Sequence, residues 1–313
     1  MKNVIIDTDP GVDDALALLL ALRSPELNVL GITTVAGNLV LGTTTRNALI
    51  IIEHSDRQVP VYAGAALPLI QELETAERAH GKDGLGDLGF SGPTSKPETE
   101  NAVDFIRRTV LGSSTPIHLI TLGPLTNVAL ALTTDRHIES HIASLTMMLG
   151  AWGTGNITQV AEFNAGVDPE ASDIVFRSAI PRTMVALDPI RSSAHILPED
   201  VERLHSAGTP WGMMAAALLR PWLRDEPSSF VSLCDPAAVA VAIDPSVAMI
   251  EKLPVRIETR GEHTRGMTVV DFRRGRGHTL GVHEPNTDVV LSFHVERFRS
   301  LVMNTYLGSE ERH

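Results

Sequence analysis

Residues 5–22, IIDTDPGVDDALALLLAL, join an apolar run to a second, longer apolar run through a loop that is rich in carboxylates. The first run, residues 4–7, has the β-branched composition of a strand, and the second, residues 13–22, has that of a helix. The carboxylates are Asp7, Asp9, Asp13 and Asp14. Because like charges repel and desolvation of a charge is costly, this group needs a compensating partner beside a buried strand.

The same alternation of strand and helix continues along the chain. Further strand-like runs lie at residues 29–36, 59–63, 117–122, 144–149 and 183–187. Helix-like segments lie at residues 44–54, 99–111, 125–132 and 169–178. The strand-like runs are apolar almost throughout, which is typical of strands buried on both faces of a parallel sheet. We therefore expect one α/β domain over residues 1–313, with an open, mainly parallel, Rossmann-like sheet covered by helices on both faces.

The C-terminal third continues with more helices and three further strand-like runs. These runs are VRIETR, MTVVDF and DVVLSFHV, and a final helix is expected over residues 296–307. Residues 72–97 are rich in Gly, Ser, Thr and charged side chains, so we expect them to form a flexible stretch.

The composition narrows the class of protein. The chain has 313 residues, of which 43% are hydrophobic, and a formal net charge of -12. Nucleic acids and anionic membranes attract basic surfaces, so neither is an expected partner. Cys234 is the single cysteine, which excludes an intrachain disulfide. The first strand leaves no room for a signal peptide, and no apolar run approaches the roughly 18 residues of a membrane span, so we expect a cytoplasmic protein.

Polar clusters follow several of the expected strands. Asp7 and Asp9 end the first strand, residues 37–38 the second, and residues 123–124 and 150–164 two later ones. Ligands of open α/β sheets bind outside the carboxyl ends of the strands. We therefore expect these clusters to line one edge of the sheet.

Two explanations compete for the carboxylate cluster. An acidic residue in the first turn of a helix often serves only as a cap or a partner of the helix dipole. Capping explains one or two of the four aspartates, whereas a bound cation explains all of them. The set contains hard oxygen ligands without a Cys/His group, which favours Ca²⁺ or Mg²⁺ over zinc.

Further ligands must come from other loops. Gly123 breaks its strand and Pro124 lacks an N–H, so the Leu122 carbonyl can be left free at the sheet edge, although a simple turn explains this stretch equally well. Asp235, in the segment CDPAA, could be a ligand or an ordinary helix cap. Three polar residues in a glycine-rich loop suit the recognition of hydroxyl groups, with turn chemistry as the alternative. They are Asn156, Glu162 and Asn164.

Taken together, these motifs resemble those of the inosine-uridine-preferring nucleoside hydrolases, a family of Ca²⁺-dependent N-ribohydrolases. The matching segments are DTDPGVDDA, TTVAGN, VPVYAG, HGKDGLGD, LGPLTN, the block from MLGAWGTGN to AEFN, and NTDVVL. They are spread over essentially the full length. The resemblance implies hydrolysis of ribonucleosides to base and ribose in nucleoside catabolism and salvage, by a homodimer or homotetramer.

The resemblance also implies roles for individual residues. The implied Ca²⁺ ligands are Asp9, Asp14, Asp235 and the Leu122 carbonyl, and Asp9 is the implied general base for a metal-bound water. The implied ribose ligands are Asp13, Asn156, Glu162, Asn164 and Asp235. Asn38 would support the water and the sugar, Met148 would line the sugar pocket, and Asp7 would support the metal loop. Buried carboxylates near the ring would stabilise an oxocarbenium-like transition state.

The chain departs from the better-known branches of this family at one position. Those branches carry His or Trp before the C-terminal metal aspartate, and this chain carries Cys234, whose thiol is a weak proton donor. Cys234 and His80 are both candidates for protonating the leaving base. His80 belongs to the expected flexible loop, which could fold over the site. The alternative is that His80 is an ordinary surface residue without a catalytic role. Candidates for stacking on the base are Trp152, Trp222 and Phe230, with a core role as the alternative for Trp222.

Two rival functions fit parts of the pattern. In a phosphatase of the haloacid dehalogenase type, Asp7 would be the nucleophile and Asp9 the acid/base, but lysine is scarce near the strand ends. A non-catalytic nucleoside-binding relative would keep the ribose ligands and lose the metal base, whereas Asp9 and Asp14 are both present.

Overall fold

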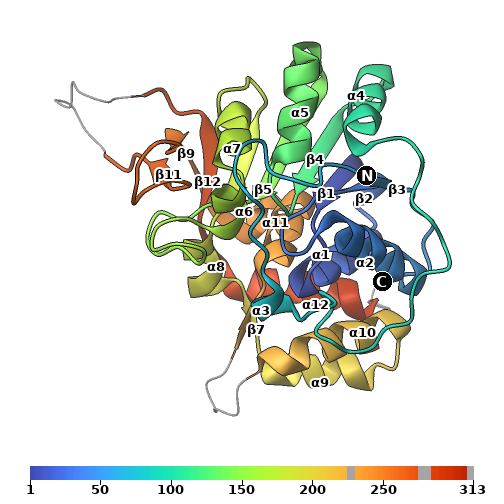
Figure 1. The fold of residues 1–313 in the computed structure, drawn as a ribbon. Helices are drawn as coiled ribbons and strands as arrows, with labels where there is room; N and C mark the ends of the chain where they lie inside the picture. Colours follow the sequence, from blue (N-terminus) through green and yellow to red (C-terminus); the bar gives the residue numbers. More distant parts are fainter. Residues whose placement is uncertain (224–229, 274–282, 309–313) are drawn as a thin grey trace.

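An eight-stranded sheet forms the centre of the molecule (Figure 1). The computed structural model describes residues 1–223, 230–273 and 283–308. Within them, the strand order is β3-β2-β1-β4-β5-β6-β12-β9, and only the edge strand β9 is antiparallel to its neighbour. The strands are β1 (Lys2–Thr8), β2 (Leu27–Thr34), β3 (Val61–Ala63), β4 (Ile117–Thr121), β5 (Ile142–Met148), β6 (Arg182–Val185), β9 (Ala248–Leu253) and β12 (Thr287–Phe293). The expected open, mainly parallel α/β sheet is confirmed.

Helices cover both faces of this sheet (Figure 1). One face carries α1 (Val12–Arg23), α2 (Leu41–His54), α10 (Pro210–Leu219), α11 (Cys234–Ile243) and α12 (Val295–Leu307). The other face carries α4 (Ala102–Gly112), α5 (Thr126–Thr134) and α7 (Pro169–Phe176). Helix α1 is apolar almost all round because it packs against the sheet and also against α2, α10, α11 and α12.

Shorter elements complete the described chain. The helices are α3 (Glu77–His80), α6 (Phe163–Val167), α8 (Leu187–Ser193) and α9 (Pro198–Ser206), with 3-10 turns η1 (Arg136–His141), η2 (Arg220–Trp222) and η3 (Pro245–Val247). Two small antiparallel pairs join β7 (His195–Ile196) to β8 (Val231–Ser232) and β10 (Val255–Ile257) to β11 (Thr268–Val270). Among all the helices of the described residues, none is long and apolar enough to cross a membrane.

The expected strands of the sheet overlap the observed ones, and the sequence analysis missed β9. That strand, AMIEKL, lies at the sheet edge and is only partly buried, so it lacks the continuous apolar run of the central strands. The expectation of a flexible stretch over residues 72–97 differs from the structure in its middle part. Leu85 is fully buried in the main core, and α3 packs beside the carboxylate loop. Residues 80–85 are therefore packed against the molecule, whereas most of the remaining stretch is exposed.

Candidate active site

The loop between β1 and α1 is organised around the Asp14 carboxylate. Asp14 Oδ2 accepts hydrogen bonds from the Gly11 N–H and from Asn38 Nδ2, both at 3.0 Å. Asp14 Oδ1 accepts from Thr8 Oγ1 at 2.5 Å and from the Asp9 N–H at 3.2 Å. Asp14 thus caps the first turn of α1 and also fixes the loop that carries the other carboxylates.

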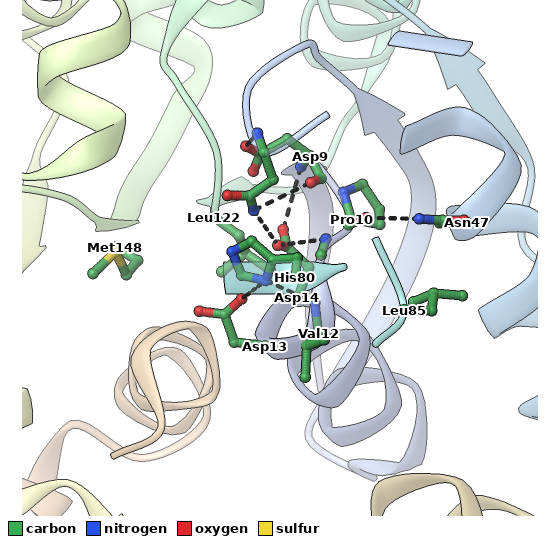
Figure 2. Close-up of polar contacts among 12 residues, drawn as sticks. Asp9, Pro10, Val12, Asp13, Asp14, Asn47, His80, Leu85, Leu122 and Met148 are labelled. Carbon is green, nitrogen blue, oxygen red and sulfur yellow. Dashed lines mark hydrogen bonds and ion pairs between the residues drawn. The ribbon is translucent and has the colours of Figure 1, made fainter. Parts of the chain in front are cut away.

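Asp9 is fully buried at the end of β1 (Figure 2). Its Oδ2 accepts a hydrogen bond of 2.6 Å from the Asn38 N–H, whereas its Oδ1 has no hydrogen-bond partner within the described residues. A Cβ at Gly37 or at Gly123 would lie 2.1 or 2.5 Å from an Asp9 oxygen, so both backbones pack directly on the carboxylate. Burial raises the pKa of Asp9 well above its usual range, and repulsion from Asp14 adds to the rise.

Three further carboxylates converge beside Asp9. One oxygen each of Asp13, Asp14 and Asp235 lies within 4.8 Å of the other two. Burial raises the pKa of Asp13, and burial together with the charges of Asp13 and Asp14 raises that of Asp235. Asp13 Oδ1 has no hydrogen-bond partner in the described structure, although His80 Nδ1 lies 3.7 Å away. Oxygen ligands, repulsion and unsatisfied buried oxygens together fit a divalent cation.

The carboxyl ends of β4 and β5 meet at Asn164. Asn164 Nδ2 donates to the Leu122 carbonyl at 2.6 Å and to the Met148 carbonyl at 3.0 Å. The sequence suggested that the Leu122 carbonyl could be free, and the structure shows that it accepts this hydrogen bond. Its second lone pair remains available for another partner. Glu162 caps α6 by accepting from the N–H groups of Asn164 and Ala165, and its Oε2 also accepts from the Gly150 N–H.

A cavity of about 210 Å³ lies above this edge of the sheet. It is lined by Asp13, Asn38, Ala76, Ala79, His80, Leu122, Met148, Asn156, Glu162, Phe163, Asn164, Cys234 and Asp235. All the expected ribose ligands are among them, together with both candidates for protonating the base. Asp9 and Asp14 are fully buried and do not line the cavity.

The three candidates for base stacking are spread over the molecule, and none lines this cavity. The Trp222 ring lies 6.2 Å from the His80 ring and also packs on the core. Trp152 packs edge-on against Phe272, and Phe230 packs against His195. Only Trp222 is thus placed beside a residue of the cavity wall.

Comparisons with known proteins agree with this geometry. The chain matches the family described as inosine-uridine preferring nucleoside hydrolase over residues 4–300. It belongs to that family. The pyrimidine-specific ribonucleoside hydrolase RihA of Shigella flexneri serotype 5b is 40% identical over 305 residues, which cover 96% of each chain.

Solved structures of nucleoside hydrolases resemble this nucleoside hydrolase closely. A plant nucleoside hydrolase, the PpNRh1 enzyme, has a TM-score of 0.89 at 31% identity and covers 98% of this chain and 99% of its own. The purine-preferring ribonucleoside hydrolase from Gardnerella vaginalis gives the same TM-score and identity, with 98% of each chain covered. The protein is an enzyme that cleaves the N-glycosidic bond of ribonucleosides, and its family is metal-dependent.

His80 of this nucleoside hydrolase is buried, not a surface residue. Its Nδ1 accepts a hydrogen bond of 3.1 Å from the Val12 N–H, and 7% of the residue is exposed (Figure 2). Because Nδ1 is the acceptor, the proton of the neutral ring is on Nε2. Nε2–H is the donor that His80 can offer to a molecule in the cavity.

Cys234 is the first residue of α11, and its thiol lines the same cavity. Burial raises the pKa of the Cys234 thiol, and the charges of Asp13 and Glu162 add to the rise. The group therefore stays a protonated thiol at neutral pH.

Several residues that organise the site were missed in the sequence analysis. Asn127 Nδ2 donates to Asp7 Oδ1 at 2.7 Å, and Thr33 Oγ1 donates to the same oxygen at 2.5 Å. Burial nevertheless raises the pKa of Asp7 to about 7. The other missed residues are Thr8, Asn47, Ala76, Ala79 and Phe163. A signal existed for Asn47 and Asn127, because asparagine is disfavoured inside apolar helices unless it binds a specific partner.

Proposed function

We propose that this nucleoside hydrolase is Ca²⁺-dependent and that Asp9 is its general base. The observation that carries the proposal is the Asp9 carboxylate, which has one oxygen held by the Asn38 N–H and the other buried without a hydrogen-bond partner in the described structure. Such an oxygen can accept a proton, and the raised pKa of Asp9 increases its basicity.

The proposed ligands of the ion are Asp9, Asp14, Asp235 and the Leu122 carbonyl. All are hard oxygen donors, and Ca²⁺ tolerates the irregular geometry that such a mixed set creates. When bound, Ca²⁺ lowers the pKa of a coordinated water and fixes its direction of attack. Asn38 supports this arrangement from the protein side, because its side chain donates to Asp14 and its N–H donates to Asp9.

We assign the ribose to the cavity. Carboxylates and amides that can bind hydroxyl groups in fixed directions line it, and they belong to Asp13, Asn156, Glu162, Asn164 and Asp235. Met148 supplies an apolar contact in the same wall. Charge on buried Asp13 and Glu162 would stabilise the positive charge that develops on the sugar ring in the transition state.

The departing base gains negative charge, and two cavity groups can donate a hydrogen bond to it. His80 offers Nε2–H, and Cys234 offers a protonated thiol. A neutral imidazole N–H is a better hydrogen-bond donor than a thiol S–H, so we assign the main stabilising contact with the departing base to His80 and a supporting contact to Cys234. Trp222, beside His80, is the stacking candidate that its position supports, whereas Trp152 and Phe230 pack against other aromatic partners.

We propose pyrimidine nucleosides such as uridine as the preferred substrates. The relative named pyrimidine-specific is 40% identical to this chain, whereas the solved structure named purine-preferring is 31% identical.

The two rival functions are less well supported. A phosphatase of the haloacid dehalogenase type needs a lysine near its site, and no lysine is among the residues that line the cavity. A purely binding relative would not need the buried Asp9 oxygen that lacks a partner.

A panel of substrates tests these assignments. The purified protein is incubated with uridine, inosine and uridine monophosphate, with and without a chelator, and free ribose and phosphate are measured. We expect ribose from uridine, less from inosine, loss of both with chelator and recovery with added Ca²⁺. Phosphate release from the monophosphate, or ribose release that resists the chelator, would contradict the proposal.

We further propose that residues 1–313 form one domain, that the enzyme is cytoplasmic, and that it assembles as a homodimer or homotetramer. The sheet supports a single domain because it uses strands from both ends of the chain. The single cysteine supports a reducing compartment. Light scattering during gel filtration would give the mass of the assembly against the 33.8 kDa of one chain.

A further inference from the structure

Asn47 joins two segments of the active site that are far apart in sequence. Figure 2 shows its contact with Pro10. Asn47 lies in α2 and is fully buried. Its Nδ2 donates to the Pro10 carbonyl at 3.1 Å and to the Asp83 carbonyl at 2.8 Å. A buried amide is costly unless it is hydrogen-bonded, and here both protons of one amide nitrogen have a backbone acceptor.

The two acceptors belong to segments with separate tasks. Pro10 follows Asp9 in the loop that carries the carboxylates, and Asp83 lies three residues after His80 in the turn that follows α3. Asn47 therefore sets the distance between the carboxylate loop and the segment that carries the proposed leaving-group donor. The contact of His80 with the Val12 N–H joins the same two segments closer to the cavity.

The turn after α3 is shaped to reach Asn47. Gly84 has a φ of +78°, a conformation that L side chains rarely adopt, and a Cβ there would lie 2.6 Å from Asn47 Nδ2. The next residue, Leu85, is fully buried in the core and anchors the turn. The close approach at Gly84 and the anchor at Leu85 both follow Asp83 directly, so they hold its carbonyl within reach of the Asn47 amide.

We propose that Asn47 is a positioning residue for His80 in the hydrolysis of nucleosides. It holds the turn after α3 against the carboxylate loop, so that the His80 donor stands at a fixed position relative to the departing base. This inference rests on the proposed role of His80. The Nε2–H of His80 stabilises the departing base only at hydrogen-bond distance, so a small displacement of His80 lowers the rate even though the nucleoside still binds.

The test compares two substrates that differ in the leaving group. The departing base of uridine needs a hydrogen-bond donor to stabilise its negative charge, whereas the p-nitrophenolate of p-nitrophenyl β-D-ribofuranoside leaves as a stable anion. For Asn47→Ala we expect kcat with uridine to fall by about 10-fold or more, with KM changed less than threefold and the nitrophenyl substrate hydrolysed within twofold of the unmodified rate. His80→Ala should give the same pattern with a larger loss.

Two further variants make the result specific. Gly84→Ala places a methyl group against Asn47 Nδ2 and Leu39, which displaces the turn and should reproduce the pattern, so it replaces Asn47→Ala if that variant does not fold. Asn127→Ala is the matched control, because Asn127 is also a buried asparagine but contacts Asp7 and Thr34 near the metal loop. It should slow both substrates alike.

The combined variant His80→Ala/Asn47→Ala separates positioning from general damage. If Asn47 acts through His80, its loss costs less than twofold in the His80→Ala background. Equal losses of Asn47→Ala with both substrates, or a full further loss in the combined variant, would overturn the inference while leaving the proposed role of His80 intact. If His80→Ala itself hydrolyses uridine at the unmodified rate, the role of His80 fails and this inference fails with it.

Discussion

The backbone at Gly11 is in direct contact with the His80 ring. A Cβ at Gly11 would lie 2.6 Å from His80 Nδ1 and 2.8 Å from Cγ, so any side chain there would push the ring away. Together with the hydrogen bond from the Val12 N–H, this contact fixes the ring against the carboxylate loop. The glycine in the first motif therefore matters for the histidine as well as for the loop itself.

Gly11→Ala should reduce uridine hydrolysis about 10-fold or more, because the added methyl displaces His80 from its hydrogen bond with the Val12 N–H. The control is Gly42→Ala in α2, where an added Cβ meets nothing within 4 Å. That control should keep its activity and gain slightly in stability from the better helix propensity of alanine. Steady-state kinetics and thermal unfolding measure both effects, and equal kinetics of the two variants would contradict the packing argument.

Asp9→Asn should abolish activity and yet stabilise the metal-free protein at neutral pH. Removal of the general base is expected to lower kcat by about 10²–10⁴-fold. The stability gain follows because the pKa of Asp9 is raised by burial, so its charged form destabilises the fold. Ribose release measures the loss of activity, and thermal unfolding in chelator measures the gain of stability. A lower Tm of Asp9→Asn in chelator would show that the Asp9 carboxylate does not destabilise the metal-free fold.

The metal-free protein should lose stability as the pH rises from about 4 to 7. Burial raises the pKa of Asp7 from 3.8 to about 7, so the folded state binds a proton that the unfolded state has released over this range. Stability from this group is therefore fully present below about pH 4 and is lost as the pH rises through about 7. The Tm of Asp7→Asn in chelator should change less with pH than that of the unmodified protein, and parallel Tm profiles would contradict this.

Added Ca²⁺ should raise the Tm more at pH 8 than at pH 5, because protonated carboxylates do not bind the ion. At a free Ca²⁺ concentration a hundredfold above Kd, the gain is about 2.7 kcal/mol, which corresponds to roughly 5 °C for a chain of this size. Mg²⁺ at the same concentration serves as the comparison for ion identity. An equal Tm shift at both pH values would show that the ion binds outside the carboxylate cluster.

Cys234 should react slowly with iodoacetamide in the folded, metal-free enzyme at pH 7.5. Thiolates are the reactive species, and burial beside Asp13 and Glu162 raises the thiol pKa, so the thiolate is scarce. We expect a rate at least about 100-fold below that of the unfolded chain, in which the thiol has its ordinary pKa. Mass spectrometry gives the rate without ambiguity because the chain has a single cysteine. Equal rates in both states would indicate an activated thiolate.

Trp222→Ala should change the ratio of kcat/KM for uridine and inosine, whereas Phe230→Ala should leave this ratio unchanged. The Trp222 ring lies 6.2 Å from the ring of His80, which lines the cavity, whereas the ring partner of Phe230 is His195, which does not line it. A base–aromatic contact is worth about 1–3 kcal/mol, which is enough to shift preference several-fold or more. A shift with Phe230→Ala alone would reverse the assignment.

The sequence by itself determined the sheet and the edge that carries the site. Apolar β-branched runs form buried parallel strands and the intervening segments form helices because both preferences are local. The carboxyl ends of parallel strands share one edge, so the placement of Asp9, Asn38, Leu122 and Asn164 along that edge followed from their positions after strands.

Only the tertiary structure decided which side chains meet at that edge. His80 and Asp83 are brought to Val12 and Asn47 across 68 and 36 positions of sequence, and the spacing of residues does not encode such contacts. The donor at the Leu122 carbonyl and the isolated positions of Trp152 and Phe230 were hidden for the same reason. Contacts of this kind depend on how helices and turns pack on the finished sheet, which no local pattern specifies.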